Sequence, residues 1–190
     1  LIPCEGEYHF VFQKRSFNIR QGGEICFPGG GFQEGVDTDF KETALRETAE
    51  ELGIPKGKIE IVGRLNTIIA PMGQVVEVFV GVADVGIEQM VVDDKEVERV
   101  FSLPVSYFEN NKPEEYYVLL RQYPYYIDEE TGKEVVTMPS KELGLPERYE
   151  KPWGTFRHKI YVYRTKEGVI WGMTARIIMD FIKFLNNPVV

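Results

Sequence analysis

The stretch Gly29–Ile54, GGGFQEGVDTDFKETALRETAEELGI, joins a run of glycines to a segment that predicts an α-helix. From Phe40 to Leu52 there is no Pro or Gly, and residues with high helix propensity dominate. Thr38 or Asp39 can cap the start of this helix, and Gly53 can end it. We therefore expect a helix over residues 40–52.

This helix would carry three glutamates on one side. At about 100° per residue, Glu47, Glu50 and Glu51 lie close together around the helix axis. The opposite side carries Leu45, Thr48, Ala49 and Leu52. We expect the carboxylates to share a face that points away from the core.

Like charges four residues apart, as in Glu47 and Glu51, repel by a few tenths of a kcal/mol. Arg46 can pair with Glu42 and Glu50, which leaves Glu47 and Glu51 unneutralised. Carboxylate oxygens are preferred ligands of Mg²⁺ and Mn²⁺, which in turn bind phosphates. We expect Glu47 and Glu51, helped by Glu50, to bind such an ion; a solvated acidic helix face is the alternative.

The residues before the helix point to the same chemistry. FPGGG at Phe27–Gly31 reads as the end of a strand followed by a loop whose backbone can approach a ligand closely. Such a loop can bring carbonyl or amide groups to the glutamate face. The whole stretch therefore predicts a site that holds a metal ion against a diphosphate.

At these residues the chain resembles the Nudix hydrolases, whose motif is Gly, five residues, Glu, seven residues, then Arg-Glu-aliphatic-x-Glu-Glu-x-Gly-aliphatic. Residues 46–54 follow the second half, with only Thr48 off the pattern. In the first half, Thr38 stands at the glutamate position and Phe32 at the glycine position. Gly30 or Gly31 fits only with a longer loop, and the first glutamate is then replaced by Asp37 or lost.

The resemblance implies an α/β fold, the Nudix-type α/β/α sandwich with a mixed β-sheet. It also implies Mg²⁺ or Mn²⁺ as cofactor and a pyrophosphohydrolase activity. The implied catalytic residues are Glu47, Glu50, Glu51 and Arg46, of which Arg46 would orient the glutamates. The general base would be Glu51, Glu96 or Glu98, although an ordinary acidic turn also explains the last two.

The preceding stretch is similar to the motif of coenzyme A pyrophosphatases. Its matching residues are Val11, Phe12, Gln13, Ser16, Ile19, Arg20, Gly23, Phe27, Pro28, Gly29 and Gly30. Lys14, Arg15 and Arg20 place cations before the glycines. We expect Arg15, Ser16, Arg20 and Gly30 to bind substrate.

This second resemblance implies hydrolysis of coenzyme A or acyl-CoA to 3',5'-ADP and 4'-phosphopantetheine or its acyl form. Two alternatives stay open. One is a Nudix pyrophosphatase that acts on ADP-ribose or another nucleoside diphosphate derivative. The other is a nucleotide-binding sensor without catalytic activity.

Composition limits the class of protein. With 190 residues, 43% of them hydrophobic, we expect one Nudix domain over residues 1–190, with an irregular, lid-like segment at 122–153.

The net charge of −8 argues against nucleic-acid binding, and no apolar run is long enough to span a membrane. Two cysteines favour a reducing cytoplasm. We expect a small-molecule substrate and leave a homodimer open.

Other elements follow from local patterns. We expect a hairpin from strands at 1–4 and 8–13, then strands over 59–69 and 75–85, and further strands at 100–103 and 156–163. A C-terminal helix should place Ile177, Ile178, Phe181, Ile182 and Leu185 in the core.

Overall fold

The structure is a computed structural model that describes residues 1–187. It divides into two compact units. The core unit comprises Leu1–Glu114 and the segment from Tyr161 to the C-terminus, and the ribbon unit comprises Glu115–Ile160.

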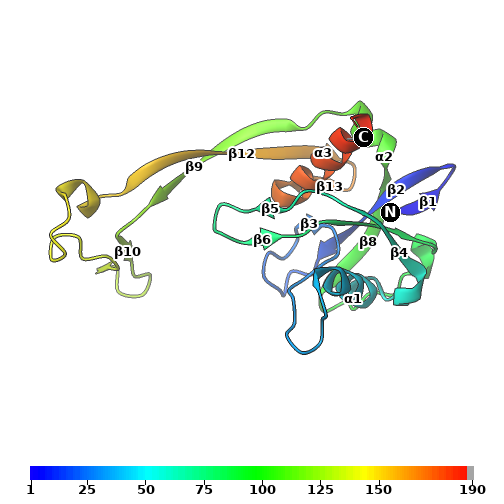
Figure 1. Ribbon diagram of the computed structural model, residues 1–190, viewed down its shortest axis with the longest axis horizontal. Coiled ribbons are helices and arrows are strands. Elements are labelled where there is room, and N and C mark those ends of the chain that lie inside the picture. Colours follow the sequence, from blue (N-terminus) through cyan, green and yellow to red (C-terminus); the bar gives the residue numbers. More distant parts are fainter. Residues whose placement is uncertain (188–190) are drawn as a thin grey trace. The chain divides into compact units, whose positions relative to one another are not determined.

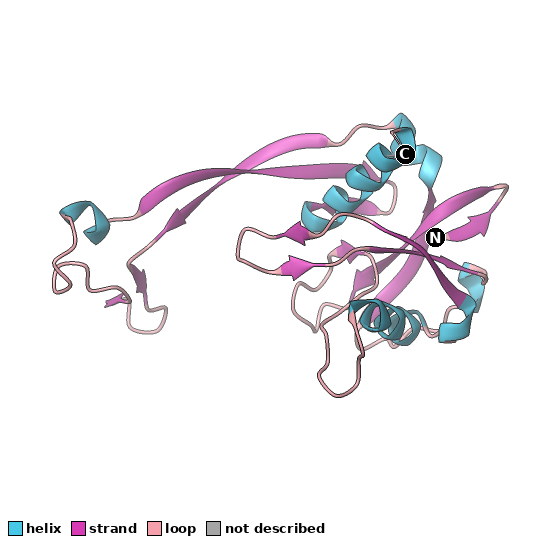
Figure 2. Cartoon of the chain, viewed as in Figure 1, coloured by secondary structure: helices cyan, strands magenta, loops and turns pink. Residues whose placement is uncertain are grey.

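Strand β2 (Glu7–Arg15) is the centre of the core unit. It pairs antiparallel with β1 (Ile2–Cys4), β3 (Ile25–Cys26) and β8 (Val97–Pro104). Figures 1 and 2 show this sheet near α1 and α3. The expected hairpin at the start of the chain is confirmed, and β8 begins three residues earlier than expected.

Successive side chains of β2 point to opposite faces of the sheet. Phe10 and Phe12 pack into a core with Phe108 of α2 (Val105–Asn110) and Phe181 of α3 (Gly172–Asn186). Val11 packs instead with Leu52 of α1 (Phe40–Leu52). Helices therefore cover both faces of the sheet, and the expected α/β/α sandwich is confirmed.

Helix α1 has the expected bounds because both ends are capped. Asp39 accepts a hydrogen bond from the backbone N–H of Glu42 at 2.8 Å. Gly53 ends the helix in the left-handed region at φ 63°, and a Cβ there would overlap the carbonyl of Val91.

The buried face of α1 differs from the expected one. Its buried residues are Thr43, Arg46, Glu51 and Leu52, whereas Leu45, Thr48 and Ala49 are half-buried. The expectation that the three carboxylates share a face away from the core is therefore wrong for Glu51. The spacing of residues along a helix does not show which side of it is covered by another part of the chain. Here the loop before α1 covers Arg46 and Glu51.

The two strands expected after α1 are interrupted. The first comprises β4 (Ile59–Arg64) and β5 (Ile68–Ile69), and the second comprises β6 (Val75–Val76) and β7 (Phe79–Ala83). β4 pairs with β7, with a register shift between Ile61 and Gly63, and β5 pairs with β6. Short 3-10 helices lie at η1 (Lys56–Lys58) and η2 (Ile87–Gln89).

Helix α3 confirms most of the predicted apolar stripe. Ile178 and Phe181 are buried, and Ile177 and Ile182 are half-buried. Leu185 is 44% exposed, so its predicted place in the core is wrong. It lies in the last turn of the helix, beyond the residues that face β2.

A three-stranded sheet has the strand order β13-β12-β9, from β9 (Glu114–Gln122), β12 (Trp153–Thr165) and β13 (Gly168–Trp171). Between β9 and β12 the ribbon unit contains a hairpin of β10 (Tyr125–Ile127) and β11 (Glu134–Val136), and the 3-10 helix η3 (Glu147–Glu150). Within residues 1–187, no helix has the length and apolar character needed to cross a membrane.

Candidate metal and diphosphate site

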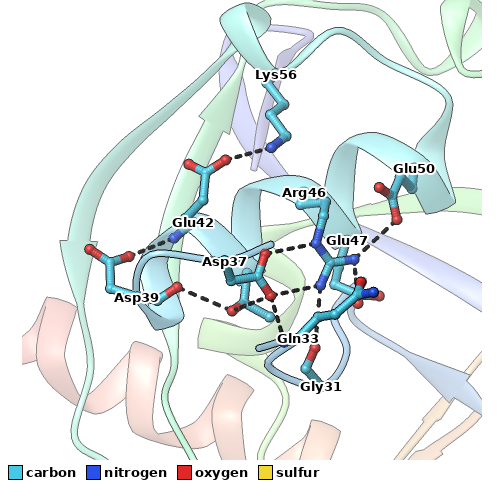
Figure 3. A network of polar contacts seen from close by, with 10 residues as sticks. Gly31, Gln33, Asp37, Asp39, Glu42, Arg46, Glu47, Glu50 and Lys56 are labelled. Carbon is cyan, nitrogen blue, oxygen red and sulfur yellow. Dashed lines mark hydrogen bonds and ion pairs between the residues drawn. The ribbon is translucent and has the colours of Figure 1, made fainter. Parts of the chain in front are cut away.

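A buried ion pair joins α1 to the loop before it (Figure 3). Arg46 Nε donates to Asp37 Oδ1 at 2.8 Å, and Arg46 Nη2 donates to Asp37 Oδ2 at 2.9 Å. The Asp37 side chain has no exposed surface and that of Arg46 is 10% exposed. The acid that pairs with Arg46 therefore lies one residue before Thr38, the position at which the Nudix-like pattern has a glutamate.

Two further donors fix Asp37. The Thr43 hydroxyl and the backbone N–H of Gln33 donate to Oδ2 at 3.0 and 2.8 Å. The Arg46 hydrogen bonds hold the pKa of Asp37 well below its usual range, against the effect of burial. In return, Asp37 raises the pKa of Arg46. The pair stays charged at any ordinary pH.

Arg46 also contacts the carboxylates of its own helix. Its Nη1 lies 2.8 Å from Glu47 Oε1 and 3.2 Å from Glu50 Oε2. Its Nη2 donates to the carbonyl oxygen of Gly31 at 3.3 Å. Figure 3 shows the guanidinium at the centre of these contacts.

These contacts correct two expectations. Glu42 does not pair with Arg46, because Lys56 binds Glu42 and the guanidinium faces Asp37. Glu47 is not left unneutralised, because Arg46 Nη1 contacts it directly.

Glu51 lies under the glycine loop. Glu51 is buried, and its Oε2 accepts a hydrogen bond from the backbone N–H of Gly29 at 2.8 Å. Burial raises the pKa of Glu51, while hydrogen bonds from Gln13 and Gly29 and the positive charge of Arg15 lower it. The predicted meeting of the glycine loop with the glutamate helix is confirmed.

Gly30 leaves room for Glu47. A Cβ added at Gly30 would overlap the Glu47 carboxylate, whereas one at Gly31 would meet nothing within 4 Å. The backbone at Gly30 and the Glu47 carboxylate therefore occupy adjoining space, and a side chain at position 30 would require the carboxylate to move.

The expected substrate-binding residues are distributed along one segment. Arg15 lies near Cys26 and Glu51, and its Nε donates to the carbonyl oxygen of Arg20 at 3.2 Å. Arg20 is exposed. Ser16 is buried, and its backbone N–H donates to the carbonyl oxygen of Glu96 at 2.9 Å.

The structure separates the three base candidates. Glu51 lies inside the site. Glu96 is exposed in the turn that contacts Ser16, and Glu98 pairs with Lys14 at 2.8 Å.

The sequence did not single out Gln13 as a functional residue. It is 1% exposed, it lies close enough to Glu51 to lower the pKa of that carboxyl, and its Oε1 has no hydrogen-bond partner among the described residues. The available signal was a polar residue directly after the apolar run Phe10–Phe12 and two residues after Val11, so that it lies on the same face of the strand.

The oxygen donors of this site fit a hard divalent cation. Glu47 and Glu51 are carboxylates, and Gln13 Oε1 is a buried acceptor to which no group in residues 1–187 donates. Within residues 1–187, no three His, Cys, Asp or Glu side chains gather closely enough to hold a metal ion. In this structure the Glu47 carboxylate is paired with Arg46, and the Glu51 carboxylate accepts a hydrogen bond from the backbone N–H of Gly29.

Comparison with known proteins identifies the family. The NUDIX domain model matches residues 1–123. The chain therefore belongs to the Nudix family, whose members generally use divalent metal ions.

Three relatives illustrate the range of similarity. The chain is 38% identical over 109 residues to Nudix hydrolase 3 of Caenorhabditis elegans, which covers 55% of this chain and 45% of the relative. It is 37% identical over 118 residues to mouse peroxisomal coenzyme A diphosphatase NUDT7, covering 62% and 48%. An uncharacterized Nudix hydrolase NudL of Photorhabdus laumondii is 27% identical over 178 residues, covering 93% and 77%. The chain spans about half the length of the first two.

Proposed function

We propose that this protein hydrolyses a diphosphate linkage with the help of Mg²⁺ or Mn²⁺, most readily in coenzyme A or acyl-CoA. The products would be 3',5'-ADP and 4'-phosphopantetheine or its acyl form. The observation that carries this proposal is the position of Glu47 and Glu51 directly against Gly30 and Gly29.

In this proposal Glu47 and Glu51 would hold the cation, with Glu50 beside them. When bound, the ion would supply positive charge to the diphosphate oxygens and to the leaving group. Arg46 would position Glu47 and Glu50 through its 2.8 and 3.2 Å contacts. Because Asp37 already balances the charge of Arg46, Glu47 can exchange its ion pair for another cation without leaving the guanidinium unpaired.

The cations of the preceding segment would bind the anionic substrate. Arg15 is the best placed of them, since it lies close enough to Glu51 to lower the pKa of that carboxyl. Arg20 is joined to Arg15 through its carbonyl oxygen and is exposed. We therefore assign phosphate contacts to Arg15 and Arg20, and a supporting position to the buried Ser16.

Similarity supports the choice of substrate. The match to the coenzyme A pyrophosphatase pattern lies at residues 11–30, and a mouse relative is named a coenzyme A diphosphatase. The two cysteines are free thiols, which fits the cytoplasmic location that we include in the proposal.

A product analysis tests the proposal. The protein is incubated separately with coenzyme A, ADP-ribose and diadenosine tetraphosphate, with Mg²⁺, with Mn²⁺ or with a chelator, and products are identified by mass. We expect metal-dependent release of 3',5'-ADP and 4'-phosphopantetheine. Faster cleavage of ADP-ribose would overturn the substrate choice. Nucleotide binding without cleavage of any compound would overturn the enzyme assignment in favour of a sensor.

A further inference from the structure

Gln13 of strand β2 is 1% exposed, less than any other polar or charged residue that is buried within residues 1–187. Side chains two residues apart in a strand point to the same face, so Gln13 lies with Val11, which packs with Leu52 of α1. In the sheet it stands directly opposite Cys26 of β3 and Val100 of β8. All of these neighbours belong to the core unit, so the ribbon unit has no part in placing Gln13.

The Gln13 amide presents its nitrogen to two acidic groups. Gln13 lies close enough to Glu51 and to Cys26 to lower the pKa of each. An uncharged side chain has this effect on an acid by donating hydrogen to it, and the only donors of an amide are on its nitrogen. Glu51 also accepts the backbone N–H of Gly29. The Glu51 carboxylate is therefore held from two sides, by strand β2 and by the glycine loop.

The oxygen of the same amide has nothing to accept. Gln13 Oε1 is buried, and no group in residues 1–187 donates to it. Nearly all buried polar atoms of proteins have a hydrogen-bond partner, and an acceptor without one costs stability. An apolar side chain such as that of Val11 would fill the space without this cost. The unsatisfied oxygen therefore indicates a partner that arrives with a ligand.

A hydrated cation would supply the missing donor. Mg²⁺ usually keeps several water molecules when one or two protein carboxylates bind it. The charge of the ion polarises such a water, which makes its hydrogens strong donors. The nitrogen and oxygen of an amide are attached to the same carbon, and the nitrogen faces Glu51. Gln13 Oε1 is therefore placed next to the carboxylate that would bind the ion.

We propose that Gln13 is a positioning residue of the cation site. It holds Glu51 through its N–H side, and its Oε1 accepts a hydrogen bond from a water molecule on the ion. This inference rests on the proposed function, since it needs the cation that Glu47 and Glu51 would bind. Gln13 touches neither the substrate nor the reacting atoms. Residues that orient metal ligands in this way change metal affinity about 10–100-fold when they are replaced.

Titration of the full chain with Mn²⁺ alone tests the proposal, with free Mn²⁺ followed by electron paramagnetic resonance. Gln13→Met removes both polar groups of the amide and keeps a side chain of similar length. We expect it to weaken Mn²⁺ binding about tenfold or more. Gln13→Asn keeps the amide but withdraws it from Glu51 by one methylene, and it should also weaken binding. Circular dichroism checks the fold, and Q13N carries the test if Q13M does not fold.

Two further proteins separate this role from packing. Cys26→Ser changes the other neighbour of the amide and should leave Mn²⁺ affinity within about twofold of wild type. Gln13→Met is also made in a Glu51→Gln background. Because Gln13 acts on the ion that Glu51 binds, the loss caused by Q13M should shrink there to less than about threefold.

The outcomes distinguish this inference from the proposed function. If E51Q weakens Mn²⁺ binding but the Gln13 variants do not, the role of Gln13 is overturned and the proposed metal site stands. The role is also overturned if C26S weakens binding as much as Q13M, or if the effect of Q13M is the same with and without Glu51. Mn²⁺ binding that E51Q leaves unchanged would overturn the metal site of the proposed function, and this inference with it.

Discussion

Arg46 and Asp37, nine residues apart, bind each other through two parallel hydrogen bonds in which the carboxylate is fully buried. This ion pair fixes the loop that follows the glycines onto α1. It also directs Arg46 Nη1 toward Glu47 and Glu50, while Nη2 donates to the carbonyl oxygen of Gly31 as well as to Asp37. The geometry of the candidate site therefore depends on a residue outside the glutamate cluster.

Asp37→Asn should loosen the whole site. The substitution keeps the shape of the side chain but leaves a buried guanidinium without its main counter-charge, which is strongly destabilising. We expect a lower Tm and a loss of kcat of about 10–100-fold, the range found for residues that orient metal ligands. Glu34→Gln, in the same loop but exposed, is the control and should change neither quantity. A D37N protein with wild-type Tm and kcat would contradict this role.

The stabilising effect of Asp37 should disappear in acid. The pKa of Asp37 is lower in the folded protein than its unfolded value near 4, so the unfolded chain takes up a proton first as pH falls. The difference in Tm between wild type and D37N should be constant from pH 7 to about pH 5 and should narrow below about pH 4. Thermal unfolding followed by circular dichroism measures it. A difference that stays constant down to pH 2.5 would refute the assignment.

Gly30→Ala should displace the Glu47 carboxylate, because the new methyl group would overlap it. We expect Mn²⁺ affinity and kcat each to fall about 10–100-fold. Gly31→Ala is a close control, since its Cβ would meet nothing within 4 Å. Titration with Mn²⁺ and steady-state kinetics compare the two variants. Equal losses in both would contradict the role of the space between Gly30 and the Glu47 carboxylate.

Arg15→Ala should weaken substrate binding more than it slows chemistry. Loss of a charged hydrogen-bond donor to a phosphate is expected to raise KM about tenfold with a smaller change in kcat. Arg176→Ala on α3, whose side chain pairs only with Asp180 among the contacts described for residues 1–187, serves as control. An unchanged KM for R15A would remove Arg15 from the substrate site.

The bounds of α1 were predicted correctly because its two capping residues, Asp39 and Gly53, directly flank it in the sequence. Asp39 and Gly53 act within a few residues, so the bounds 40–52 do not depend on tertiary structure. The partners of Arg46 were not predictable in this way. They depend on the path of the loop that brings Asp37 onto the helix, and one residue of loop length decides whether position 37 or 38 faces Arg46.

The burial of Glu51 shows the same limit. Helical spacing alone placed it with Glu47 and Glu50 on an outward face, but in the structure it is buried and accepts the backbone N–H of Gly29 from the glycine loop. Likewise, the tyrosines of residues 115–160 did not reveal a ribbon, because its strand pairing joins segments more than 30 residues apart.

The most direct test of the account compares Glu51→Gln with Glu42→Gln. Both remove one carboxylate from α1, but Glu42 pairs with Lys56 and lies outside the proposed metal site. With Mg²⁺ and coenzyme A, E51Q should lose about 10³-fold or more in kcat and bind Mn²⁺ weakly, while its circular dichroism stays that of wild type. E42Q should keep wild-type turnover and Mn²⁺ affinity. Near-normal turnover by E51Q would contradict the claim that the buried glutamate beneath the glycine loop carries the chemistry.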